Sequence, residues 1–193
     1  MRKVLLTILL FIPLLSACQK NSGNGINLLG SDQTQLAIDL ITDANNDLKK
    51  IKAIYKANQN GIELLSSAMK DKDAEKVKTI SNDLALQINE GLMLGESAIT
   101  KIAKAKDLNI NDTYKEYLRL KEEAIRNQLD AFEYRRQIAE VLRDGFGGKD
   151  PQQIERAKAI FREKDESFQK LMEEGKILSQ EANQLAKESL KKQ

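Results

Sequence analysis

From residue 31 to residue 150 the chain contains no proline, and apolar residues recur there every three or four positions. This spacing places the apolar side chains on one face of an α-helix. Proline disrupts helix interiors, so its absence leaves room for long helices. Runs that alternate apolar and polar residues, which indicate half-buried strands, are lacking. The sequence therefore predicts an all-α protein.

Four segments carry the helical periodicity, over about residues 32–69, 73–106, 113–144 and 151–190. Short polar turns separate the first three, and Gly145-Phe146-Gly147-Gly148 makes the clearest break before the fourth. Pro151 suits the first position of the last helix. The expected N-cap residues, whose side chains accept hydrogen bonds from the first turn, are Asp73, Asn111 or Asp112, and Asp150.

The predicted helices must bury their apolar stripes against one another, because polar residues cover the rest of each helix. At 1.5 Å per residue, each helix would be about 50–65 Å long. Three short connections make sequence neighbours antiparallel, and near-heptad spacing favours coiled-coil-like crossing angles of about 20°. We expect an elongated, antiparallel up-down-up-down four-helix bundle. One boundary stays open: Asn58-Gln59-Asn60-Gly61 favours a continuous first helix with a bend, or a break that would give five helices.

Composition argues against several classes of function. The chain has no histidine and a single cysteine, which removes histidine general bases, Ser-His-Asp triads and the usual zinc sites. Arg2 and Lys3 account for the entire net charge of +2, so residues 18–193 are neutral overall. A nucleic-acid-binding domain would keep a basic excess. We therefore expect no enzymatic activity, no metal or other cofactor, and no nucleic-acid partner.

The N-terminus is organised like a secretory signal peptide. Arg2 and Lys3 precede a mostly apolar run over residues 4–15, and the small residues Ser16 and Ala17 follow it. The run is shorter than the roughly 20 apolar residues that a membrane-spanning helix needs, which disfavours an uncleaved anchor. Cleavage after Ala17 would leave Cys18 as the first residue, either with a free thiol or in modified form.

Leu15-Ser16-Ala17-Cys18 resembles the lipobox of bacterial lipoproteins. The resemblance implies that the Cys18 thiol receives a diacylglyceryl group and that residues 1–17 are then removed. It also implies a sorting role for Gln19, because an aspartate at this place retains lipoproteins of enteric-type bacteria in the inner membrane. We expect a lipid anchor in the outer membrane, with the protein facing the periplasm or the cell surface. In a bacterium without an outer membrane, the anchor would lie in the outer leaflet of the plasma membrane.

The region after the cysteine predicts a tether followed by one domain. Residues 18–30 are rich in Asn, Gly and Ser and contain few residues able to build a core. A flexible coil of this length spans on the order of 20 Å. Residues 31–193, the predicted bundle domain, would therefore be held a short distance from the lipid surface.

Two groups of helix residues allow a structural and a functional interpretation. Gly91 and Gly95 form a small-xxx-small pair, which favours close helix packing and, alternatively, a ligand groove at the middle of the bundle. Asp39, Asp43 and Asp47 share one helix face and predict cross-helix ion pairs or, alternatively, a calcium site. The lysines expected to pair with them are Lys101, Lys104 and Lys106.

Polar residues also interrupt the apolar stripe of the third helix. Arg135-Arg136 and Gln128 occupy its edge, and antiparallel pairing about residue 148 makes Glu163 the expected carboxylate partner of an arginine there. We interpret them as a solvated or bridged edge or, alternatively, as a buried polar layer that fixes register or lines a small pocket. Aromatic residues predicted to cap the core rather than to form a stacking platform are Tyr114, Tyr117, Tyr134 and Phe146.

These features predict a membrane-anchored envelope lipoprotein that acts as a non-enzymatic protein-interaction or structural module, with another envelope protein as its partner. The alternative is a helical-bundle carrier or sensor for a small apolar or lipid ligand, bound near Gly91 and Gly95.

Overall fold

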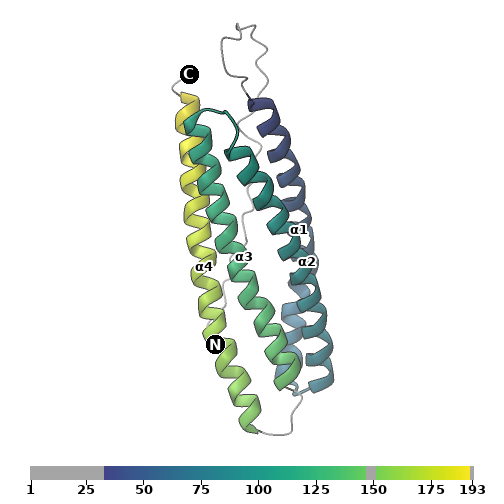
Figure 1. Cartoon of the computed structure of the whole chain (residues 1–193). Coiled ribbons are helices and arrows are strands. Elements are labelled where there is room, and N and C mark those ends of the chain that lie inside the picture. Colours follow the sequence, from purple (N-terminus) through teal and green to yellow (C-terminus); the bar gives the residue numbers. More distant parts are fainter. Residues whose placement is uncertain (1–32, 147–150, 192–193) are drawn as a thin grey trace, which may run out of the picture.

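The computed structural model describes residues 33–146 and 151–191, which form four α-helices (Figure 1). Their bounds are α1 Thr34–Lys70, α2 Ala74–Lys106, α3 Asp112–Gly145 and α4 Pro151–Lys191. The all-α prediction is confirmed, and the four expected helices begin and end within a few residues of their observed limits. The predicted signal peptide, the tether with Cys18 and Gln19, and the Asp150 cap lie outside the described residues.

Side-chain caps fix the starts of two helices as expected. The Asp73 carboxylate accepts a hydrogen bond from the backbone N–H of Lys76 at 3.1 Å, at the start of α2. The Asn111 side chain accepts one from the N–H of Tyr114 at 2.7 Å, at the start of α3. These bonds satisfy backbone donors that have no partner within the helix.

Helix α1 runs without a break through residues 58–61, so the five-helix alternative does not occur. Gly61 has a packing role in this segment, because a Cβ atom at this position would lie 3.2 Å from Leu84 Cδ2 on α2. The glycine therefore lets the Leu84 side chain approach the backbone of α1. Close packing offsets the weak helix propensity of the segment.

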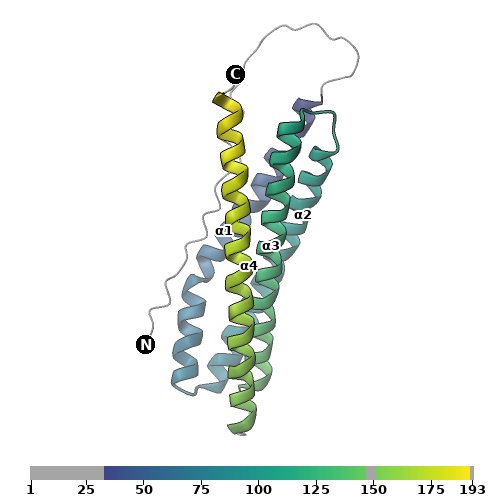
Figure 2. The same ribbon diagram turned by 90° about the vertical axis from the view of Figure 1, so that its left-hand side faces the viewer.

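The helices are antiparallel and pack in the order of the sequence, which confirms the up-down-up-down bundle (Figures 1 and 2). Within the described residues, Cα atoms approach to 8 Å between α1 and α2, between α2 and α3, and between α3 and α4. No Cα atom of α1 comes this close to α4. The sides of α1 and α4 that would meet in a closed bundle are called the open edge below.

Ile62 shows what the open edge leaves uncovered. It lies seven residues from Tyr55, which contacts the α3 side chain Phe132, and seven residues from Met69, which packs against buried core residues. The heptad spacing places all three on the inner side of α1. Ile62 nevertheless remains 40% exposed.

The buried core consists of two clusters. The first lies toward the end of the bundle that holds the start of α1, and the second lies toward the end that holds the α1–α2 turn. Buried residues of the first cluster include Ile41, Ile99, Ile102, Leu118, Leu129 and Ala182. Those of the second include Leu65, Val77, Leu84, Ile138, Leu142 and Phe146. The middle of the bundle belongs to neither cluster.

Candidate functional site in the middle of the bundle

Five side chains from α1, α3 and α4 occupy the level between the two core clusters. The Tyr55 ring meets the Phe132 ring edge-on at a centroid distance of 6.1 Å, and Phe132 meets Phe168 in the same way at 6.2 Å. Edge-to-face pairs of this kind are favourable ring arrangements. The remaining two members are Arg135 and Asp165. We call these five residues the aromatic layer.

Arg135 brings a positive charge into this layer. Its guanidinium carbon lies 4.0 Å from the centroid of the Phe168 ring, and Nη2 lies 2.8 Å from Asp165 Oδ1. Burial lowers the pKa of Arg135, and the neighbouring Asp165 and Tyr55 oppose that shift. A guanidinium keeps its charge in proteins, so the layer contains a cation balanced by a carboxylate.

The predicted carboxylate partner of Arg135 was wrong, although it lies only two residues from the observed one on α4. The sequence favoured Glu163, whereas the ion pair uses Asp165, two residues further along α4. Two residues on a helix differ by about 200° in direction, so a small error in register exchanges one face for the opposite one. The adjacent Arg136 points away from the layer and pairs with Glu133 and Glu140 of its own helix.

The two glycines of α2 differ in their surroundings. A Cβ atom at Gly95 would lie 2.3 Å from Leu129 Cδ2, so the side chain of α3 fills that position. A Cβ atom at Gly91 would meet nothing within 4 Å, although Gly91 itself is buried. Close helix packing therefore accounts for Gly95, whereas no close neighbour accounts for the glycine at residue 91. The predicted ligand groove at these residues stays a prediction.

Gln128 lies one helical turn from Phe132 on α3. It is only 8% exposed, and its Oε1 atom has no hydrogen-bond partner. The aliphatic part of the side chain packs against α4, where Cγ would lie 3.2 Å from a Cβ atom at Gly175. A buried amide oxygen without a donor costs free energy. Gln128, which the sequence placed at the edge of the apolar stripe of α3, is therefore buried.

Sequence reasoning missed a third polar residue on this side of α3. Lys121 is 4% exposed, and its Nζ atom donates to Asn183 Oδ1 of α4 at 2.9 Å. Burial lowers the pKa of Lys121 to about 8. The signal was present in the sequence, because positions 121, 128 and 135 follow one another at heptad spacing.

The prediction that the aspartates of α1 form ion pairs with α2 is confirmed for Asp47. Asp47 accepts from Lys101 Nζ at 2.5 Å and from Ser97 Oγ at 2.9 Å, both on α2. Burial raises the pKa of the Asp47 carboxyl, but these hydrogen bonds outweigh it and hold the pKa below its usual value. Asp39 instead accepts from Gln35 of its own helix, and Lys106 pairs with Glu122 of α3.

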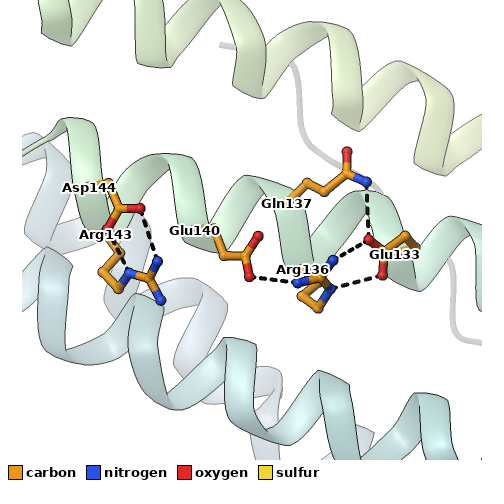
Figure 3. A network of polar contacts seen from close by, with 6 residues as sticks. All are labelled: Glu133, Arg136, Gln137, Glu140, Arg143 and Asp144. Atoms are coloured by element: carbon orange, nitrogen blue, oxygen red, sulfur yellow. Dashed lines mark hydrogen bonds and ion pairs between the residues drawn. The ribbon is translucent and has the colours of Figure 1, made fainter.

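A surface network runs along the last turns of α3 (Figure 3). The Arg136 guanidinium bridges Glu133 and Glu140, while Arg143 pairs with Asp144. Gln137 donates to Glu133 and accepts from Lys164 of α4 at 2.6 Å. Most of these contacts join residues within one helix and remain partly solvated, so each stabilises the fold only weakly.

The aromatic residues outside the layer lie in several places. Tyr114 and Tyr117 stack at 5.9 Å near the start of α3, where Tyr117 belongs to the first core cluster. Phe146 is buried in the second cluster at the opposite end. These three cap the core as expected. Tyr134 lies mid-helix, with Lys164 Nζ 5.6 Å from its ring centroid.

Across residues 33–146 and 151–191, no group of three or more acidic, histidine or cysteine side chains is arranged to hold a metal ion. None of the helices described has both the length and the apolar composition needed to cross a membrane. Comparisons of the chain with protein-family models, curated protein sequences and solved structures found no match.

Proposed function

We propose that the protein is an envelope lipoprotein, anchored through a lipid on Cys18, that binds another envelope protein through its helical surface without catalysing a reaction. The observation that carries the interaction is the open edge. Ile62 lies on the inner stripe of α1 yet is 40% exposed, and no Cα atom of α4 comes within 8 Å of a Cα atom of α1. An amphipathic helix of a partner would bury such a surface.

The lipobox and the tether support the anchored part of this proposal. An acylated Cys18 with a tether of about twelve residues would keep the bundle within tens of ångströms of the membrane. Stable anchoring needs more than one acyl chain, which lipoprotein processing would supply. An anchored module meets its partners in two dimensions, which raises their effective concentration.

Site-specific photocrosslinking in the native cell tests the interaction. A photoreactive amino acid at Ile62 should crosslink a discrete envelope protein, because this position lies on the open edge. The same residue at Met93, which is 76% exposed on α2, is the matched control. Equal crosslinking from both positions, or none from Ile62 in correctly anchored protein, would reject the open edge as the interface.

The second candidate function is a carrier or sensor for a small apolar ligand. The specific observation in its favour is Gly91, which is buried although a Cβ atom there would have no neighbour within 4 Å. Ligand sites in helical bundles lie between facing helices, and Gly91 is one of the buried residues of α2.

A further inference from the structure

We propose that the open edge binds an acidic amphipathic helix of a separate protein, whose carboxylates pair with Lys49, Lys52 and Lys56 of α1. We call these three residues the lysine row. The inference rests on the proposed function and names the chemistry of its partner. It depends on the side of α1 that the lysine row occupies, on the lack of carboxylates around the row, and on its distance from Ile62.

The lysine row lies on the side of α1 that belongs to the open edge. Residues that precede an inner residue of α1 face α2, as Asp47 shows through its ion pair with Lys101. Gly61, two heptads further along, contacts the same helix. Each member of the row instead follows an inner residue, and successive helix positions differ by about 100° in direction. The inner residues that they follow are Leu48, Ile51 and Tyr55.

The row is therefore turned away from α2. Within the described residues, α2 is the one helix whose Cα atoms come within 8 Å of those of α1. No other described helix covers the lysine row.

No carboxylate neutralises the charge of the lysine row. All three lysines are exposed, and none of them forms an ion pair with another described residue. By contrast, Nζ of Lys50 on the same helix lies 3.7 Å from Asp47 Oδ1. Residues 48–62 contain no Asp or Glu. Lys52 and Lys56 are one turn apart, so their like charges repel each other, and an acidic helix would supply the missing carboxylates.

Ile62 gives the same surface an apolar end. It lies six residues beyond Lys56 and is 40% exposed. From Lys49 to Ile62 the surface runs for about 20 Å along the helix axis. A partner helix of about 14 residues spans this length, with acidic residues over two turns and an apolar side chain on Ile62. Apolar contact flanked by charged residues is typical of surfaces that bind an amphipathic helix.

The parts of this chain outside the described residues do not supply such a helix. Residues 18–32 contain one acidic residue, residues 147–150 contain one, and residues 192–193 contain none. The lysine row also adjoins the inner stripe of α1 rather than its outer face. This position favours a helix over an anionic lipid surface, because a packed helix contacts the inner stripe and its flank together.

Photocrosslinking from Ile62 in the native cell, repeated in charge variants, tests the inference. Combining Lys49→Glu, Lys52→Glu and Lys56→Glu should reduce the yield of crosslinked protein by about 5-fold or more, since three ion pairs become three like-charge contacts. Arginine at the same three positions keeps the charge and should keep the crosslink. Circular dichroism verifies that each variant is folded, and Triton X-114 extraction verifies that it is anchored.

The matched control reverses three exposed lysines that lie away from the open edge and should crosslink as the unchanged protein does. These lysines are Lys76, Lys104 and Lys187. An equal loss of crosslinking in this control would assign the effect to net charge and overturn the role of the lysine row.

A charge exchange with the partner segment provides a second readout. Mass spectrometry of the crosslinked product locates that segment, which we expect to carry acidic residues over two helical turns. A synthetic peptide of the segment should bind the purified acylated protein in a phosphatidylcholine nanodisc and bind the triple glutamate variant weakly. Replacing the acidic residues of the peptide with lysine should reverse this preference, which a misfolded variant would not do.

The possible failures are distinguishable. Absence of a crosslinked protein from Ile62 in the unchanged protein would overturn the proposed interface and this inference together. A crosslink that the triple glutamate variant leaves unchanged, or a partner segment without acidic residues, would overturn the acidic helix and leave the interface. A crosslink to lipid, or to a second copy of this chain, would overturn the separate protein as the occupant.

Discussion

Leu129 of α3 fills the space above Gly95 of α2, so that a Cβ atom at residue 95 would lie 2.3 Å from Leu129 Cδ2. We expect Gly95→Ala to lower the free energy of unfolding by about 1–3 kcal/mol, because Leu129 must move within a packed core. Gly91→Ala is the matched control and should be stabilising by up to about 1 kcal/mol, since its methyl group enters open space and alanine favours the helix. Urea unfolding followed by circular dichroism measures both. Equal effects of the two substitutions would contradict this account.

Lys121 should make stability depend on pH in the alkaline range. Its pKa is about 8 in the folded protein and 10.5 without burial, so the unfolded chain binds more protons between these values. The free energy of unfolding should therefore rise with pH from about 8 to 10.5, by on the order of 3 kcal/mol in total. Urea unfolding at pH 7 and pH 9.5 samples most of this window. Lys121→Met should flatten the profile, and a profile that stays steep in this variant would assign the effect to other groups.

The Arg135–Asp165 pair should be costly to break on one side only. Asp165→Ala leaves the guanidinium partly buried without a carboxylate, and we expect a loss of about 1–3 kcal/mol in unfolding free energy. The double variant Arg135→Met with Asp165→Leu should recover much of this loss, because apolar side chains replace both charges. Arg136→Met, next in the sequence but paired on the surface, should cost less than about 1 kcal/mol. A double variant less stable than Asp165→Ala alone would argue against this interpretation.

Cys18→Ser should prevent lipid attachment if the lipobox interpretation holds. The expected result is an unprocessed or misprocessed chain that no longer partitions into the detergent phase, measured by Triton X-114 extraction and mass spectrometry of the N-terminus. Gln19→Asp, which keeps the cysteine, serves as the control and should keep the lipid while shifting the protein toward the inner membrane. Unchanged partitioning of Cys18→Ser would reject the anchor.

The fold followed from the sequence because its signals are local and repeated. Apolar spacing fixed the existence of each helix, and Asp73 and Asn111 marked two starts through capping chemistry that acts within four residues. A cross-helix ion pair between an α1 aspartate and Lys101 also followed, because a short turn limits the register of the α1–α2 hairpin, but the sequence did not identify Asp47 as the aspartate that forms it.

The candidate site was less accessible to sequence reasoning because it depends on contacts between helices. Glu163 was chosen over Asp165 because the register of α3 and α4 was taken from pairing about residue 148, and an error of two residues selects another face of α4. The different surroundings of Gly91 and Gly95 depend on where Leu129 points, which no local pattern states. Burial of Lys121 was missed because a lone lysine is normally solvent-exposed, although its heptad relation to Gln128 and Arg135 was visible.

The serial packing of α1 on α2, α2 on α3 and α3 on α4 keeps most contacts between chain neighbours. Low contact order of this kind favours folding within microseconds to milliseconds, since few long loops must close before contacts reward them. A nascent polypeptide can complete the first hairpin before α4 has been synthesised, and the last helix then adds to a surface that already exists.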